Sequence, residues 1–281
     1  MEKMETPLMS VRHLNKQFGT GCMHCQNGKT DELVGNYCPH CGTVYACRDL
    51  NFDLYDGEIL GVVGESGSGK STMMRCLYFD QEVSGGTATI RTYKNGRANL
   101  FTESSQQQRF IRNTVLGMVY QNPYLGLKMN FSSIGNIAEK LIAAGCRNVS
   151  MMENRGVALL DRVNIPAHRR KDEPKTFSGG MQQRVQIAKA LSNNPPVLLL
   201  DEVTTGLDLS VQANVLDLIK QIQRESGVSM IVVSHDLAVI RMLADRTIVM
   251  LDGQIIEQGL TDQIMEDPQH PYTQQLVYSL L

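Results

Sequence analysis

The chain has 281 residues, of which 42% are hydrophobic and 20% are charged, and its formal net charge is −2. This length allows one large α/β domain or two small ones, and the near-neutral charge lacks the basic footprint that duplex nucleic acid requires. No stretch approaches the roughly 20 apolar residues of a membrane helix, and residues 1–10 lack the apolar core of a signal peptide. We therefore expect a cytosolic protein with no nucleic-acid partner.

Apolar patterns predict several strands in the first third of the chain. Residues 8–18 alternate as in an edge strand, and residues 44–58 alternate with Leu50, Phe52 and Leu54 on one face. Residues 58–64 form a continuous apolar run that ends in glycine, which suits a strand buried on both faces. A helix should follow at 70–79, and residues 87–98 offer a further strand and an Asn-Gly turn.

The remainder of the chain predicts helices and then alternating elements. Residues 132–193 are mostly helical in pattern, because apolar residues recur at i, i+3 and i+4. Within them, residues 178–196 predict an amphipathic helix that a double proline stops. From 197 to 259, strands and helices alternate in the manner of a parallel sheet, so we expect an α/β fold.

Paired cysteines predict a metal site within residues 21–43. Cys22, Cys25, Cys38 and Cys41 follow the pattern C-x₂-C, twelve residues, C-x₂-C. Four thiolates at this spacing suit tetrahedral Zn²⁺, with redox-active thiols or an iron–sulfur cluster as alternatives. We expect the metal to be structural and to fold an otherwise flexible loop. The second interpretation is that the insert is a docking site for a partner protein.

The remaining cysteines and two nearby histidines have simpler interpretations. His24 and His40 lie inside the cysteine pairs and are expected to be bystanders instead of ligands. Cys47, Cys76 and Cys146 stand alone in the sequence. We expect them to be small buried hydrophobes, because disulfides are rare in a cytosolic chain.

The stretch GESGSGKS matches the phosphate-loop pattern G-x-x-x-x-G-K-[ST] between a predicted strand and a predicted helix. Its glycines let backbone N–H groups face phosphate oxygens, and the helix N-terminus adds partial positive charge. Lys70 should reach the β- and γ-phosphates, and Ser71 should bind Mg²⁺. The expected ATP-binding residues of this loop are Gly64, Glu65, Ser66, Gly67, Ser68, Gly69, Lys70, Ser71 and Thr72.

An acidic pair ends the predicted strand VLLLDE. Asp201 is placed to hold magnesium, directly or through water, and Glu202 would polarise the attacking water in phosphoryl transfer. Alone, such a pair more often marks a solvated turn or a helix cap. Together with the phosphate loop, it predicts a second nucleotide motif.

Further motifs resemble the ATP-binding cassette (ABC) ATPases. FSGGMQQRVQIAKAL at 177–191 resembles their signature helix, TTGLD at 204–208 their D-loop, and VYQNP and VVSHD the loops that carry Gln121 and His235. The resemblance implies a P-loop cassette fold, with a RecA-like core, an antiparallel β-subdomain, a helical subdomain at 126–193 and a tail at 261–281. Residues 1–281 would form a single domain, and residues 21–43 would be a zinc-ribbon-like insert.

The resemblance also implies an arrangement for catalysis. Two copies would face head to tail, and each would present Ser178, Gly179, Gly180 and Asp208 to the ATP of the other. Catalysis would involve Glu202, His235 and Gln121, and Mg²⁺ would be held by Ser71, Gln121 and Asp201. Two positions depart from the family pattern, namely Met181 in the signature and Val203 where proline is usual, and both spare the residues that would contact ATP.

The base of ATP has two candidate aromatic partners. Phe18, at the end of the first predicted strand, resembles the aromatic residue that stacks on adenine in the family. Base stacking on an aromatic ring contributes about 1–3 kcal/mol. Core packing is the ordinary alternative for this residue, and Tyr45 is the second candidate.

Within the family, residues 133–149, 164–184 and 259–281 resemble the K subunits of the bacterial carbon–phosphorus lyase system. That resemblance implies a soluble lyase core as partner in phosphonate breakdown. The main alternative is the ATPase subunit of a dipeptide or nickel importer, which shares the HPYT tail and would bind a membrane permease. A DNA-repair ATPase is disfavoured, because no sustained heptads predict the coiled coil that it needs.

Overall fold

The computed structural model describes residues 6–26 and 32–278, which divide into two compact units. Unit 1 comprises the described residues within 1–55, 60–103 and 233–281, and unit 2 comprises residues 56–59 and 104–232. The strands are β1 (Met9–Phe18), β2 (Val44–Leu54), β3 (Ile59–Val63), β4 (Gly85–Ile90), β5 (Leu116–Val119), β6 (Val197–Asp201), β7 (Ser229–Val233), β8 (Arg246–Leu251) and β9 (Gln254–Leu260). The helices are α1 (Lys70–Leu77), α2 (Ser105–Thr114), α3 (Pro123–Gly126), α4 (Ser133–Ala143), α5 (Val149–Arg162), α6 (Gly179–Ala190), α7 (Leu209–Ser226), α8 (Leu237–Leu243), α9 (Thr261–Glu266) and α10 (Pro271–Tyr278).

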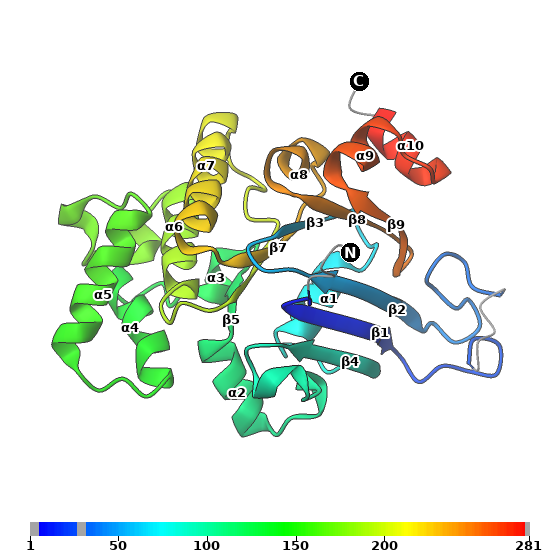
Figure 1. The fold of residues 1–281 in the computed structure, drawn as a ribbon, viewed down its shortest axis with the longest axis horizontal. Coiled ribbons are helices and arrows are strands. Elements are labelled where there is room, and N and C mark those ends of the chain that lie inside the picture. The colour runs from blue at the N-terminus through cyan, green and yellow to red at the C-terminus, as the bar shows by residue number, and fades with distance from the viewer. Residues whose placement is uncertain (1–5, 27–31, 279–281) are drawn as a thin grey trace. The chain divides into compact units, whose positions relative to one another are not determined.

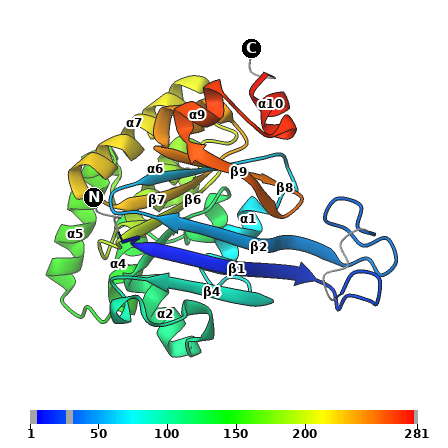
Figure 2. The ribbon, with the colours of Figure 1, turned by 45° about the vertical axis from the view of Figure 1, so that its right-hand side comes forward.

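Unit 1 contains a three-stranded antiparallel sheet in the order β2–β1–β4 (Figure 2). Leu50, Phe52 and Leu54 are buried along one face of β2, as their alternation predicts. The prediction of an edge strand for residues 8–18 is wrong, because β1 pairs on both sides. Alternation of apolar and polar residues indicates that one face of a strand is buried. The number of strands that pair with it depends on the tertiary fold.

The same unit contains β3, which pairs in parallel with β8, and β9, which pairs antiparallel with β8. All five residues of β3 are buried, as a continuous apolar run predicts. The antiparallel β9 departs from the all-parallel alternation expected for residues 197–259. The reason is local: Asp252 and Gly253 both have positive φ, which allows a two-residue turn between the strands.

Unit 2 combines β5, β6 and β7 with most of the helices. The parallel strands β5 and β6 are buried throughout, and α4, α5 and α6 pack against one another (Figure 1). Helix α6 ends at Ala190, before Pro195 and Pro196. Its buried residues extend over more of the helix surface than the single apolar face of an amphipathic helix. No helix in the described residues is both long and apolar enough to cross a membrane.

The predicted metal insert connects β1 to β2 within unit 1. Phe18 pairs with Val44 at the end of the ladder, so the connection leaves and re-enters the sheet at neighbouring positions. Gly19 lies against Thr43 at this neck, where an added Cβ would be 2.5 Å from the threonine hydroxyl. Residues 27–31 of the connection lie outside the described part of the chain.

Candidate nucleotide site and four-cysteine cluster

The predicted phosphate loop connects β3 to α1 in unit 1. Gly64 and Gly69 have φ of 147° and 102°. Gly64 contacts the backbone of β8, and Gly69 contacts the backbone of β2. A Cβ at Gly64 would be 2.1 Å from the carbonyl oxygen of Met250, and one at Gly69 would be 2.0 Å from that of Ala46. Glycine is therefore required at both positions for conformation and for space.

Lys70 is buried, and its ammonium group is held within the loop. Its Nζ donates to the carbonyl oxygens of Gly64 and Glu65, at 2.7 and 2.8 Å, and lies 3.3 Å from Ser68 Oγ. Ser71 and Thr72 occupy the first turn of α1, where the partial positive charge of the helix N-terminus favours an anion. The predicted loop residues are thus brought together around one helix N-terminus.

The tail of unit 1 contacts this loop. Tyr272, in α10, accepts a hydrogen bond from the backbone N–H of Glu65, with 2.9 Å between Glu65 N and Tyr272 Oη. Glu257 of β9 accepts hydrogen bonds from the backbone N–H groups of Gln269 and His270, which fixes the segment before α10. Sequence reasoning missed this contact, since no local pattern links residue 272 to residue 65.

His235 and Phe18 occupy exposed positions in unit 1. His235 directly follows the buried Ser234 beyond β7. Phe18 is the last residue of β1, and its side chain is 41% exposed with Lys16 Nζ 4.9 Å from the ring centroid. Tyr45 is less available, because its hydroxyl donates to the carbonyl oxygen of Cys25 at 2.7 Å. Phe18 is therefore partly exposed, whereas Tyr45 is attached to the insert.

In unit 2, the structure brings Gln121 and the acidic pair together. Gln121 Nε2 donates to Glu202 Oε2 at 3.0 Å, and Thr205 Oγ1 donates to the same oxygen at 3.2 Å. Asp201 is buried at the end of β6, while Glu202 has a φ of 46°. A non-glycine residue in the left-handed backbone region costs on the order of 1–3 kcal/mol of conformational strain, and such residues cluster at functional sites.

The predicted signature segment begins α6. Ser178 caps the helix, accepting a hydrogen bond from Met181 N, and Ser178 and Gly179 are exposed at this helix N-terminus. Gly180 allows close packing, because an added Cβ would be 2.3 Å from Val211 Cγ1 of α7. Asp208 caps α7 in the same way, and the hydrogen bond from Val211 N holds the pKa of its carboxyl below its usual value.

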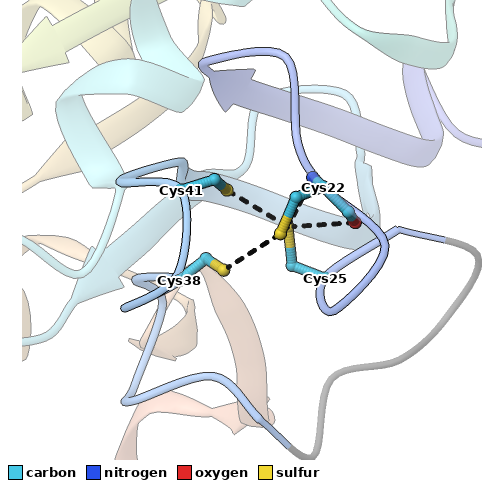
Figure 3. Close-up of side chains that lie close together, drawn as sticks. All are labelled: Cys22, Cys25, Cys38 and Cys41. Atoms are coloured by element: carbon cyan, nitrogen blue, oxygen red, sulfur yellow. Dashed lines mark hydrogen bonds between the residues drawn. The ribbon is translucent and has the colours of Figure 1, made fainter.

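The four predicted cysteines form one cluster (Figure 3). The Sγ–Sγ distances are 3.7 Å for Cys22–Cys25, 3.8 Å for Cys22–Cys38 and 3.6 Å for Cys25–Cys41. A tetrahedral zinc ion with Zn–S bonds of about 2.3 Å would hold its sulfurs about 3.8 Å apart. The sulfur spacing and the donor set therefore both fit a zinc ion.

The environment of the thiols differs around the cluster. Hydrogen bonding from Thr43 lowers the pKa of Cys41 to about 6. A hydrogen bond from the His24 backbone acts to lower the pKa of Cys22, but burial and the neighbouring thiols outweigh it and raise the value to about 12. Crowded thiols resist joint deprotonation, and a bound divalent cation would remove that resistance.

The two bystander histidines form a separate group. His24 and His40 stack with ring centroids 4.1 Å apart, and both approach Glu32 Oε2, at 2.8 and 3.3 Å. Among the single cysteines, Cys47 and Cys76 are buried as predicted. Cys146 is only half-buried, so its prediction as a buried hydrophobe is wrong. It follows the end of α4, where the chain leaves the packed helices.

A family model described as ABC transporter matches residues 47–205. This span includes the phosphate loop, Gln121, the signature segment and the acidic pair. The chain belongs to the ABC transporter family. It is an ABC ATPase that hydrolyses ATP.

Individual relatives agree with this family. The cassette is 45% identical over 233 residues to the putative phosphonates utilization ATP-binding protein PhnK of Escherichia coli K12, covering 83% of this chain and 90% of that protein. It is 37% identical over 256 residues to the oligopeptide transport ATP-binding protein OppD of Bacillus subtilis, covering 89% and 70%. A dimeric ATP-binding cassette solved in a post-hydrolysis state with ADP and phosphate matches with a TM-score of 0.74 at 26% identity, covering 90% of this chain and 98% of that one.

The ABC ATPase also contains two supporting residues that its local sequence patterns did not predict. Gln183 and Gln186 are buried in α6, and their side chains bind the backbone that precedes and includes Gln121. Gln186 accepts from Tyr120 N at 2.6 Å and donates to Tyr120 O at 3.1 Å, and Gln183 donates to Gln121 O at 3.1 Å. In the sequence, two glutamines one turn apart on an otherwise apolar helix face indicate buried polar groups that need hydrogen-bond partners.

Proposed function

We propose that this ATPase acts in phosphonate breakdown, on a soluble carbon–phosphorus lyase core in the cytoplasm. The observation that carries the proposal is the 45% identity to PhnK over most of both chains. Identity to OppD is lower, although it extends over slightly more of this chain. The described residues include no membrane-spanning helix, which is compatible with a soluble partner but does not identify it.

Two copies would close head to tail around two ATP molecules. The phosphate loop of one copy, Gly64 to Thr72, would hold the phosphates, with Phe18 stacked on the adenine. The other copy would supply Ser178, Gly179, Gly180 and Asp208. The dimeric cassette with a TM-score of 0.74 supports this arrangement, as does the exposure of Ser178 and Gly179 at the N-terminus of α6.

Hydrolysis would use the residue pair of unit 2 together with His235. Glu202 would orient and polarise the attacking water, and its hydrogen bonds from Gln121 and Thr205 would hold the carboxylate in position. His235 would contact the γ-phosphate. Ser71, Gln121 and Asp201 would hold Mg²⁺, which would neutralise phosphate charge when bound with ATP.

Cys22, Cys25, Cys38 and Cys41 would hold a structural Zn²⁺. The sulfur spacing supports this proposal, because it matches the separation that tetrahedral zinc imposes. The ion would contribute folding free energy to the connection between β1 and β2, where Met23, Val34 and Tyr37 are exposed.

The partner is tested by affinity purification of the Glu202→Gln protein from its own cell, with ATP and magnesium. This variant should retain ATP in a closed dimer, and mass spectrometry then identifies what remains bound. Lys70→Ala serves as the matched control, because it should lose ATP and therefore the closed state. Lyase subunits in stoichiometric amounts with the first variant alone would support the proposal.

Recovery of a membrane permease in place of lyase subunits would contradict the lyase assignment. The ATPase would then be an importer subunit, an assignment in line with its 37% identity to OppD. The ATP-dependent difference between the two variants separates specific partners from background in either case.

A further inference from the structure

The described residues of the metal insert and the phosphate loop both belong to unit 1. The second cysteine pair leads directly into β2, whose third residue is Ala46. The carbonyl oxygen of Ala46 touches Gly69 so closely that an added Cβ would be 2.0 Å away. The start of β2 thus supports the end of the phosphate loop by direct backbone contact.

Two hydrogen bonds attach Tyr45, the neighbour of Ala46, to the insert. Its hydroxyl donates to Cys25 O at 2.7 Å, within the first cysteine pair, and its backbone N donates to Asn36 O at 2.8 Å. The second pair is fixed from the same strand end, where Cys38 N donates to Thr43 O at 2.9 Å. The cysteine pairs and the start of β2 are therefore held as one body.

Asn36 extends this body to the phosphate loop itself. Its side-chain Nδ2 lies 3.5 Å from the carbonyl oxygen of Gly67, at the long end of the hydrogen-bond range. Gly67 has a φ of 88° and lies in the middle of the loop, where the backbone must keep its N–H groups directed inward. A contact on the carbonyl side of this peptide restrains the orientation of the next N–H.

A second restraint on the loop comes from elsewhere. Gly253, in the turn between β8 and β9, donates its N–H to Ser68 O at 3.1 Å. Its own carbonyl accepts from Arg48 N at 2.7 Å. This restraint does not involve the cysteines. Loss of the metal should therefore make the phosphate loop more mobile but leave it partly ordered.

We propose that the metal-loaded insert is a positioning element for the phosphate loop, with Asn36 as its positioning residue, so that metal occupancy sets nucleotide affinity. The inference rests on the proposed zinc site. Metal loss releases the cysteine pairs, and the segment around Asn36 loses its fixed place beside Gly67. Nucleotide then has to order the loop on binding, which lowers its affinity.

The test measures MgADP binding by calorimetry on the full chain, since ADP contacts the loop and is not hydrolysed. Wild-type protein is compared before and after chelation of zinc, with the chelator removed by desalting and zinc content measured in both samples. We expect about tenfold weaker binding after zinc removal. Circular dichroism and the thermal unfolding of the remaining structure establish that the metal-free protein is folded.

Asn36→Ala keeps all four cysteines and isolates the proposed link. It should retain full zinc and bind MgADP about threefold more weakly, at the lower end of what one neutral hydrogen bond contributes. Zinc removal should then cost it less than it costs the wild type. Val34→Ala is the matched control, because that side chain is 71% exposed in the same segment and should match the wild type throughout.

Equal MgADP affinity of folded zinc-loaded and zinc-free wild type would overturn the proposal. Weak binding by Asn36→Ala with an undiminished zinc dependence would overturn the role of Asn36. Purified wild type that takes up no zinc would instead overturn the metal assignment on which the inference rests. The zinc measurement therefore separates the two failures.

Discussion

Gln121 Nε2 donates a hydrogen bond to Glu202 Oε2 at 3.0 Å, although 81 residues separate them in the sequence. The glutamine follows β5 and the glutamate follows β6, and these strands are parallel neighbours. The carboxyl ends of parallel strands meet at one edge of a sheet, which is where α/β folds bind their ligands. The hydrogen bond therefore joins two predicted motifs at the expected edge.

Glu202→Gln should reduce ATP turnover by about 10²- to 10⁴-fold, because the amide cannot accept a proton from the attacking water. ATP binding should persist, since the phosphate loop is unchanged. Steady-state turnover and equilibrium ATP binding check both halves. Glu225→Gln, at an exposed ion pair with Arg162, should match the wild type. Unchanged hydrolysis in Glu202→Gln would remove Glu202 from the proposed mechanism.

Gln186→Leu should destabilise the protein by about 1–3 kcal/mol, because the part-buried N–H of Tyr120 loses its hydrogen bond to Gln186. It should also reduce turnover, since the backbone before Gln121 is no longer held. The free energy of unfolding in denaturant and the turnover number measure the two effects. Gln221→Leu, on the exposed face of α7, is the matched control. A stable, fully active Gln186→Leu protein would show that this contact is dispensable.

Gly180→Ala should destabilise unit 2 by about 1–3 kcal/mol, because the new Cβ overlaps Val211 Cγ1 at 2.3 Å. Adding Val211→Ala should recover much of the loss by removing the opposing methyl groups. Gly85→Ala, where an added Cβ meets nothing within 4 Å, controls for glycine replacement in general. Denaturant unfolding of the wild type, Gly180→Ala, Val211→Ala and the double variant gives the coupling free energy, and a value near zero would contradict a direct clash.

Tyr272→Phe should raise the KM for ATP about two- to threefold, because Glu65 N loses its protein acceptor. The effect is modest, since water can replace an acceptor at an exposed site. Tyr278→Phe, at the exposed end of α10, removes a hydroxyl from the same helix and should leave the KM unchanged. Identical values for both variants would show that the tail does not position the phosphate loop.

Cys38→Ser should abolish zinc binding, because Cys38 is a buried member of the four-sulfur cluster. Cys146→Ser should keep the full metal content, as Cys146 lies outside that cluster. Atomic absorption of the purified proteins measures the outcome directly. Zinc retained in Cys38→Ser at the wild-type level would place the metal elsewhere.

Much of the site was predictable from local sequence, for physical reasons. Gly64, Gly69 and Lys70 satisfy requirements of backbone conformation and charge that act within eight residues. Cysteine spacing likewise reports which sulfurs one ion can hold. Such constraints are short in range, so the residue types and their separations express them completely.

Only the tertiary structure decided which segments meet. The central place of β1 and the burial of Gln183 and Gln186 depend on neighbours far along the chain. So do the contacts of Tyr272 with Glu65 and of Asn36 with Gly67. The local sequence determined the chemistry of each motif, because that chemistry is short-ranged. Packing of distant strands and helices decided which motifs could act on one another.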